Sequence, residues 1–239
     1  MKTIYLLIVL APLFGAAVAG LAGGRIGRAN AHRITVAAVA VSALLSLWVL
    51  YQHVWGGAAT FNETIYRWAV AGGINLEVGF LVDRLTALMM VIVTSVSLAV
   101  HVYTIGYMHD DAGYQRFFSY INLFTFAMLM LVMANNFLQL FFGWEAVGLV
   151  SYLLIGFWYK KETAIFANLK AFLVNRVGDF GFLLGIAAVL MYYGSLDYVE
   201  VFAAADAAPA MTMSIFGTEA LVATVAAILL FIGAMGKSA

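Results

Sequence analysis

The chain has 239 residues, of which 65% are hydrophobic and 10% are charged, and its mean hydropathy is +1.00. In soluble domains about a quarter of the residues are charged, so the composition excludes a water-soluble globule and indicates an integral membrane protein. The absence of cysteine excludes disulfides, thiolate-bound iron–sulfur clusters and cysteine zinc sites. A formal net charge of zero excludes the basic surface that binds nucleic acid.

Seven stretches approach the roughly 20 apolar residues that a membrane-spanning helix needs. We therefore predict an all-α polytopic membrane protein with about seven transmembrane helices. The first stretch also fits a signal peptide, because Lys2 precedes an apolar run that small residues follow. We prefer a span, since Pro12 interrupts the run. The predicted limits are Ile4–Leu21, Ile34–Val54, Leu81–Tyr107, Phe117–Met133, Phe137–Tyr159, Ala164–Tyr193 and Glu219–Ala239.

The loops predict an orientation. Basic residues gather in the connections after the first, third and fifth spans, whereas the intervening connections carry mixed charge, acidic charge or none. Positive loops favour the cytoplasm, so we expect these three connections to be cytoplasmic and the N-terminus to lie outside, despite Lys2. The basic residues concerned are Arg25, Arg28, Arg33, Arg116, Lys160, Lys161 and Lys170.

Two outer connections differ from simple turns. In Tyr66–Phe80, Gly72 and Gly73 separate two short runs, and apolar residues alternate with others after the turn, which predicts a β-hairpin. The hairpin either caps the bundle or docks to a neighbouring subunit. The connection Gly194–Gly217 is rich in small residues and predicts a loop with room for a short helix.

One acidic residue, Glu145, lies inside the apolar segment FFGWEAVGLVSYLLIGFW. A carboxylate at the centre of a span costs on the order of 2.5–3.5 kcal/mol. Gly143, Gly148 and Ser151 surround it at helical spacing, and small residues let another helix approach closely. We therefore expect Glu145 to face protein. It is either a hydrogen-bonded contact between helices or a functional group, and function is the default interpretation.

The sixth predicted span contains a second charged motif, NLKAFLVNRVGDFGFLLG. Arg176 and Asp179 are three residues apart, close enough on a helix to form an ion pair. This pair either neutralises itself locally or takes part in function. Asn175 extends the polar stripe, and Gly178 and Gly181 narrow the helix around the carboxylate.

The last span contains Lys237. At about 1.5 Å per residue from Glu219, Lys237 is expected near the far side of the hydrocarbon, where it would be an ordinary interfacial lysine. His101 is another polar residue inside a span, and we interpret it as a hydrogen-bonded core residue before a proton carrier. The four histidines show no metal-ligand spacing. The chain ends without a polar tail, which suggests a piece of a longer protein.

The motifs FFGWEAVGLVSYLLIGFWY, NRVGDFGF and IGAMGKSA, in this order, resemble the antiporter-like membrane subunits of complex I: subunit L of bacterial NADH–quinone oxidoreductase and mitochondrial subunit 5. The resemblance implies two inverted five-helix repeats after three leading helices. Residues 1–116 would then hold the three leading helices with the hairpin near 66–80. Residues 117–239 would hold the first four helices of the first repeat, incomplete at the C-terminus. In this family the lysine-bearing helix is discontinuous at mid-membrane.

The resemblance also implies a function, which is proton translocation through a buried relay coupled to electron transfer in other subunits. Glu145 and Lys237 would be its two partners, Asp179 would modulate the lysine, and Arg176 and His101 would support them. NADH oxidation and quinone reduction would use FMN and iron–sulfur clusters on partner subunits, with no cofactor or metal on this chain.

The partners implied are other membrane-arm subunits, especially a neighbouring antiporter-like subunit, within the bacterial cytoplasmic membrane. Two alternatives remain open at this point. The chain is a subunit of a multisubunit Na⁺/H⁺ antiporter with no redox enzyme attached, or it is a structural membrane scaffold.

Overall fold

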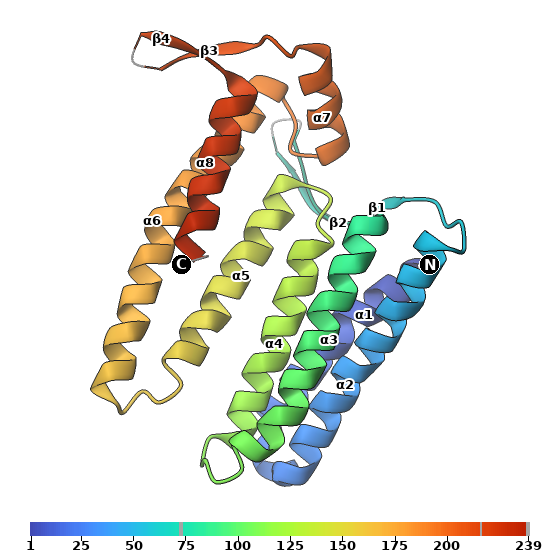
Figure 1. Cartoon of the computed structure of the whole chain (residues 1–239), viewed down its shortest axis with the longest axis vertical. Helices are drawn as coiled ribbons and strands as arrows, with labels where there is room; N and C mark the ends of the chain where they lie inside the picture. Colours follow the sequence, from blue (N-terminus) through green and yellow to red (C-terminus); the bar gives the residue numbers. More distant parts are fainter. Residues whose placement is uncertain (72–73, 216, 238–239) are drawn as a thin grey trace.

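The computed structural model describes residues 1–71, 74–215 and 217–237, which form a bundle of antiparallel helices with strands at one end (Figure 1). Within these residues, six helices, α1 to α6, are long and apolar enough to cross a membrane. This result confirms the predicted helical membrane fold. The helices are α1 (Lys2–Leu21), α2 (Gly23–Val54), α3 (Arg84–Tyr107), α4 (Tyr114–Val132), α5 (Phe137–Ile155), α6 (Glu162–Tyr193), α7 (Tyr198–Ala207) and α8 (Val222–Lys237).

Helices α1 to α4 pack together as the leading bundle, and α5 joins it along α4 (Figure 1). Its core is a cluster of fully buried apolar side chains that includes Tyr5 of α1, Met90 of α3 and Leu129 of α4. Helices α6 and α8 form a closely packed pair on the far side of α5. The charged residues singled out in the sequence lie where this pair meets α5.

Local signals set several helix ends. The Asp83 carboxylate accepts a hydrogen bond from the backbone N–H of Thr86 at 2.7 Å, which caps the start of α3. Asn136 caps α5 in the same way through the backbone N–H of Gln139 at 2.8 Å. Helix α6 ends at Gly194, whose φ of 72° is the left-handed conformation that glycine adopts most easily.

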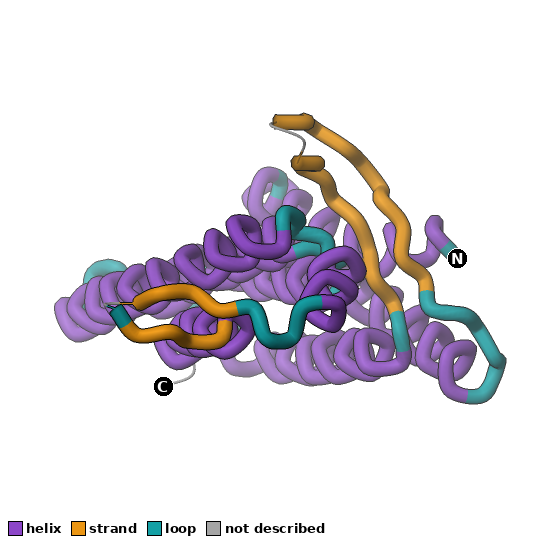
Figure 2. Tube along the Cα trace, turned by 90° about the horizontal axis from the view of Figure 1, so that it is seen from above, coloured by secondary structure: helices purple, strands orange, loops and turns teal. Residues whose placement is uncertain are grey.

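The predicted hairpin is confirmed and is longer than Tyr66–Phe80. Strands β1 (Phe61–Ala71) and β2 (Ile74–Val82) pair antiparallel, and the ribbon that they form projects over one end of the helices (Figure 2). The predicted turn residues Gly72 and Gly73 lie outside the described residues.

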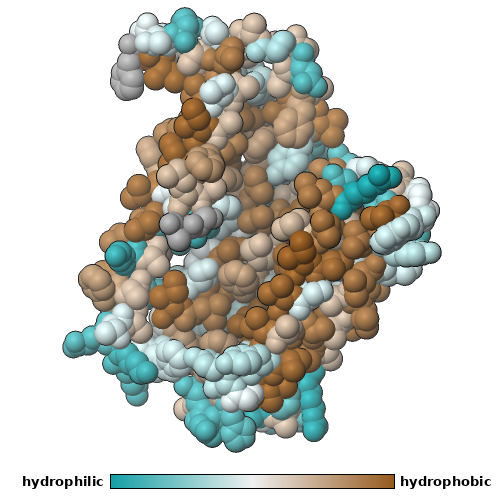
Figure 3. Space-filling view, in the orientation of Figure 1, coloured by the Kyte–Doolittle hydropathy of each residue, from teal (hydrophilic) through white to brown (hydrophobic). Residues whose placement is uncertain are grey.

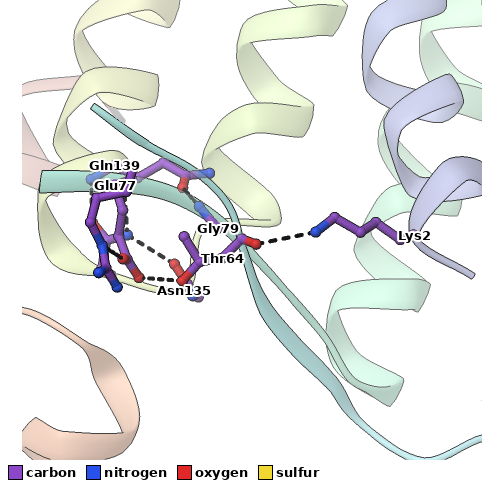
Figure 4. Close-up of polar contacts among 8 residues, drawn as sticks. Lys2, Thr64, Glu77, Gly79, Asn135 and Gln139 are labelled. Carbon is purple, nitrogen blue, oxygen red and sulfur yellow. Dashed lines mark hydrogen bonds and ion pairs between the residues drawn. The ribbon is translucent and has the colours of Figure 1, made fainter. Parts of the chain in front are cut away.

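The hairpin is fastened to the start of α5 (Figure 4). The backbone N–H of Gly79 in β2 donates to the side-chain oxygen of Gln139 at 2.8 Å, and this bond is buried. The Asn136 amide donates to the backbone carbonyl of Glu77 at 3.3 Å. The residues that begin α5 therefore also hold β2 in place.

The connection between α6 and α8 contains α7, in agreement with the expected short helix, and also a hairpin that the sequence did not indicate. Its strands are β3 (Thr212–Ile215) and β4 (Thr218–Leu221). The prediction that the last span begins at Glu219 is wrong, because that residue pairs in β4 and α8 starts at Val222. Strand pairing thus removes the first residues from the expected helix.

The molecule presents an apolar belt between two polar ends (Figure 3). The N-terminal α1 and the β1–β2 hairpin share one end, where Lys2 donates to the backbone carbonyl of Thr64 at 3.3 Å. The connections from α3 to α4 and from α5 to α6 lie at the other end (Figure 1), where Arg28 donates to the Asp111 carbonyl at 2.9 Å. The loops therefore alternate between ends as the charge pattern predicts.

Candidate functional site

Charged side chains from neighbouring helices meet between α5 and α6. Arg176 contacts two carboxylates: its Nη1 lies 2.5 Å from Glu145 Oε2, and its Nη2 lies 2.8 Å from Asp179 Oδ2. The side chains of Asp179 and Glu145 are 4% and 24% exposed. The predicted Arg176–Asp179 pair is therefore present, but it is not self-contained, because the same guanidinium also binds Glu145.

Trp144 connects the acidic residues to Lys237. Its indole N–H donates to Asp179 Oδ1 at 2.7 Å, and its ring stacks on Phe182 with centroids 5.0 Å apart. The Lys237 ammonium lies over the same indole ring, 4.5 Å from its centroid, and donates to the Trp144 backbone carbonyl. Sequence reasoning missed Trp144. A tryptophan beside a buried charge is a usable signal, because a buried indole N–H needs an acceptor.

Lys237 lies halfway down the helix pair, so the expectation that it lies near the far side of the hydrocarbon is wrong. Helix α8 runs antiparallel to α6: Gly185 faces Leu230, and Gly178 faces Gly236. Gly178 is halfway along α6, and Lys237 follows Gly236 directly. The C-terminal end of α8 accordingly lies at mid-height in Figure 1. Helix α8 starts at Val222, later than expected, and its start is level with the end of α6. Its last residue, Lys237, therefore reaches only to the middle of α6.

Glycines permit these contacts. A Cβ atom on Gly178 would lie 3.0 Å from the Cα of Gly236, so α6 and α8 touch backbone to backbone. A Cβ atom on Gly148 of α5 would lie 3.0 Å from Lys237 Nζ and 3.7 Å from Arg176 Nη2. Both cations therefore border the same gap over Gly148. The predicted narrowing of these helices by small residues is confirmed.

The site retains unpaired polar atoms. Glu145 Oε1 and Arg176 Nε are buried and have no hydrogen-bond partner among the described residues. In the same part of the chain, no ion pair joins Lys237 to Glu145 or Asp179. A pocket of about 260 Å³ opens beside them, with room for water. It is lined by Glu145, Ala146, Gly148, Leu149, Phe172, Asn175 and Arg176.

His101 lies elsewhere, between α3 and α4. It is fully buried, its Nδ1 is 2.7 Å from the Ser97 carbonyl oxygen, and its ring packs 6.1 Å from that of Phe118. This placement agrees with the interpretation of His101 as a hydrogen-bonded core residue, and it separates His101 from the four charged residues. Within the described residues, no group of three histidine, aspartate or glutamate side chains could hold a metal ion.

Two family models match the chain. The model described as NADH-ubiquinone oxidoreductase (complex I), chain 5 N-terminus, matches residues 68–118. The model described as NADH:quinone oxidoreductase/Mrp antiporter, TM, matches residues 134–239, which include all four charged residues of the site.

Curated relatives and a solved structure agree with these matches. NADH-quinone oxidoreductase subunit L of Neisseria meningitidis serogroup B is 62% identical over 240 residues, covering 99% of this chain and 36% of the relative. NADH-ubiquinone oxidoreductase chain 5 of Triticum aestivum is 45% identical over 235 residues, covering 98% of this chain and 35% of the relative. The Mrp complex from Dietzia sp. DQ12-45-1b contains a similar fold, with a TM-score of 0.78 and 24% identity over 99% of this chain and 24% of that chain.

The chain spans about a third of the length of the curated relatives that it matches. Over nearly all of its own length, it is similar in sequence to these relatives, and its fold is that of an antiporter-like membrane subunit. It therefore belongs to the antiporter-like family of complex I membrane subunits, represented by NADH-quinone oxidoreductase subunit L and chain 5.

Proposed function

We propose that this chain is part of a proton-translocating membrane-arm subunit of respiratory NADH:quinone oxidoreductase, and that Glu145, Asp179, Arg176 and Lys237 form its relay. One observation carries the proposal: Arg176 binds both carboxylates, while Lys237, beside it, forms no ion pair among the described residues and contacts neutral groups of Trp144. Two acidic and two basic side chains thus share one site, and the ion pairs among them can change partner.

The change that we propose is an exchange of the partner of Glu145. In the described arrangement Glu145 pairs with Arg176, and the Lys237 ammonium lies on the other side of the space that the missing side chain of Gly148 leaves. When Lys237 moves toward Glu145, attraction holds the carboxylate ionised and the lysine protonated. When the two separate, each charge loses its partner in a poorly solvated place, and the lysine releases its proton to water in the pathway.

The energy involved suffices for a switch. At an effective dielectric constant of about 20, two unit charges 4 Å apart interact by roughly 4 kcal/mol. At about 1.36 kcal/mol for each tenfold change in proton affinity, gaining or losing one such partner changes that affinity roughly a thousandfold. The pocket beside Glu145 and Arg176 supports a route for water to these groups.

The proposal includes the setting of the chain. Residues 1–116 would supply three leading helices and residues 117–239 the first four helices of an antiporter-like repeat. The N-terminus and hairpin end would lie outside a bacterial cytoplasmic membrane. A neighbouring antiporter-like subunit would adjoin the chain, and FMN, iron–sulfur clusters and quinone would act on partner subunits.

Replacement of Glu145 by glutamine tests the relay. The assembled complex is reconstituted in vesicles, and NADH oxidation and the resulting pH gradient are measured together. We expect Glu145→Gln to lower the gradient formed per NADH several-fold, because the exchangeable charge is gone. Glu63→Gln, which changes an exposed glutamate beside Lys2, is the matched control. An unchanged gradient in Glu145→Gln would favour a structural scaffold.

The alternative of a Na⁺/H⁺ antiporter subunit has one observation in its favour, the fold that the chain shares with the Mrp complex. Purification of the chain with its native partners separates the two. We expect flavin and NADH:quinone activity to accompany the chain. Sodium-driven proton exchange without flavin would support the antiporter.

A further inference from the structure

A second buried polar cluster lies in the leading bundle, apart from the charged site. Ser97 and His101 of α3 and Asn122 and Thr125 of α4 compose it. The side chains of His101 and Asn122 are 0% exposed. The proposed relay does not use this cluster.

The hydroxyl groups and one ring nitrogen of the cluster are satisfied within it. The Ser97 and Thr125 hydroxyl oxygens lie 2.5 Å apart, and Thr125 also donates to the Ile121 carbonyl at 2.9 Å. His101 Nδ1 lies 2.7 Å from the Ser97 carbonyl oxygen, which can only accept. Nδ1 therefore carries the proton, and the other nitrogen of a neutral imidazole, Nε2, is an acceptor.

Three polar atoms of the cluster remain unpaired. His101 Nε2 and both amide atoms of Asn122 are buried and have no hydrogen-bond partner among the described residues. Asn122 lies beside the imidazole, but the two groups do not meet in hydrogen-bonding geometry. The other side of the amide is closed by α1, since a Cβ atom on Gly15 would lie 2.8 Å from Asn122 Nδ2. Each unpaired buried group costs about 1–3 kcal/mol.

We infer that this cluster is a binding site for internal water between His101 and Asn122. One water molecule can donate to His101 Nε2, donate to the Asn122 carbonyl oxygen and accept from the Asn122 amide N–H on the same edge of the amide. Buried waters typically make about three such bonds to polar groups that are otherwise unsatisfied. Native proteins bury few unsatisfied polar groups. A single water molecule would give each of the three unpaired atoms of His101 and Asn122 a hydrogen-bond partner.

Radiolytic footprinting of the native membrane complex tests this inference directly. The sample is equilibrated with H₂¹⁸O, exposed to a short X-ray pulse and analysed by mass spectrometry. Hydroxyl radicals formed from a bound water oxidise the side chains beside it. Phe118, 0% exposed and packed on His101, reports on the site. Phe80, 2% exposed in an apolar cluster, is the matched control.

We expect ¹⁸O incorporation at Phe118 to exceed that at Phe80 several-fold. Equal labelling of the two phenylalanines would overturn the inference, and this comparison needs no variant to fold. In Asn122→Leu we expect the excess at Phe118 to disappear. In Thr104→Val, which removes a hydroxyl bonded only to the Val100 carbonyl, we expect it to persist.

A second measurement uses the sign of a stability change. If the Asn122 amide were dry, replacing it with the similarly sized leucine would remove two unpaired polar atoms and raise Tm. Because we place water there, we expect Tm of Asn122→Leu to stay the same or fall. A Tm raised by several degrees would contradict the water site. Since the relay lies elsewhere, this outcome leaves the proposed function untouched.

Discussion

The leading bundle and the α5–α6–α8 region solve the burial of polar groups in opposite ways. In the leading bundle, the buried polar side chains are neutral and several hydroxyls bond to their own helix: Thr94 donates to the Met90 carbonyl at 2.7 Å, and Thr104 donates to the Val100 carbonyl at 2.7 Å. Ser42 of α2 differs, because it donates across to the Ile8 carbonyl of α1 at 2.8 Å. In the other region, the described ion pairs run through Arg176, which joins two helices. Bonds inside one helix leave nothing to exchange, whereas a bond between helices can change partner.

Both regions leave apolar side chains exposed on the outside of their helices. The leading bundle encloses an apolar core that α1, α3, α4 and β2 share. Helix α6 has large apolar side chains exposed along its length, among them Phe166, Val177 and Phe180. This face needs lipid or another protein against it in the membrane. Helices of the leading bundle expose large apolar side chains as well, among them Leu44 and Tyr103, so both regions have surface that lipid or a neighbouring protein can cover.

The largest expected effect comes from replacing Arg176, because this removes the only residue that the described ion pairs of this region share. Arg176→Met leaves Glu145 and Asp179 close together without the cation that bridges them. We expect a loss of stability of about 1–3 kcal/mol, between the ranges for exposed and buried pairs, and loss of the NADH-driven pH gradient. Thermal unfolding of the assembled complex and the vesicle assay measure the two effects.

The control for this change is Lys2→Met, which breaks the Lys2–Glu63 pair at 3.8 Å, in which both side chains are about half exposed. An exposed pair contributes about 0–1 kcal/mol, so proton pumping should be retained. Equal stability losses in the two variants would mean that the ion pairs of Arg176 contribute no more than an exposed surface pair. The proposed difference between the two regions would then be wrong.

A smaller effect is expected for Trp144→Phe, which sharpens the comparison. The substitution keeps a ring to stack on Phe182 and to hold Lys237, but it removes the donor to Asp179. Because Arg176 still binds Asp179, the unpaired oxygen should cost about 1 kcal/mol, the low end of the range for a buried polar atom, which thermal unfolding measures. Trp68→Phe, on the hairpin, should cost less than this. If the two variants unfold alike, the indole N–H does not hold Asp179.

The smallest effect concerns a loop at the other end of the leading bundle. The Trp158 indole N–H, 2.9 Å away, and the Gly113 backbone N–H lower the pKa of Asp111 below its usual 3.8. A lowered carboxyl pKa stabilises the folded state above the unfolded value, and this contribution is lost as pH falls through the folded value. Asp111→Asn should therefore reduce Tm slightly near neutral pH and make no difference in acid. A constant difference across pH would exclude this linkage.

The spans, the first hairpin and the Arg176–Asp179 pair were predictable from the sequence because each depends on local spacing. Apolar runs of sufficient length predict helices, alternation after Gly73 predicts a strand, and residues three apart on a helix are neighbours. The alternation of loops between the two ends follows from the same count. None of these inferences needs to know how distant segments pack.

The arrangement of the site was less predictable, because it depends on how separate helices align. The family resemblance, not residue spacing, implied that Glu145, Asp179 and Lys237 form one group, and it did not imply that Arg176 would bind Glu145. The depth of Lys237 was wrong because a short strand pairing, in β3 and β4, shortened α8. Trp144 was overlooked, since its role exists only where α5, α6 and α8 converge.

The bond between Gly79 and Gln139 has a mechanical consequence. Gln139 precedes Glu145 by six residues, which is about 9 Å along α5. A protein that binds and moves the β1–β2 hairpin therefore also moves α5, because separating the two would leave the buried Gly79 N–H and the Gln139 side-chain oxygen unpaired, at about 1–3 kcal/mol each. The polar end of the molecule is thus linked mechanically, through α5, to the buried carboxylate of Glu145.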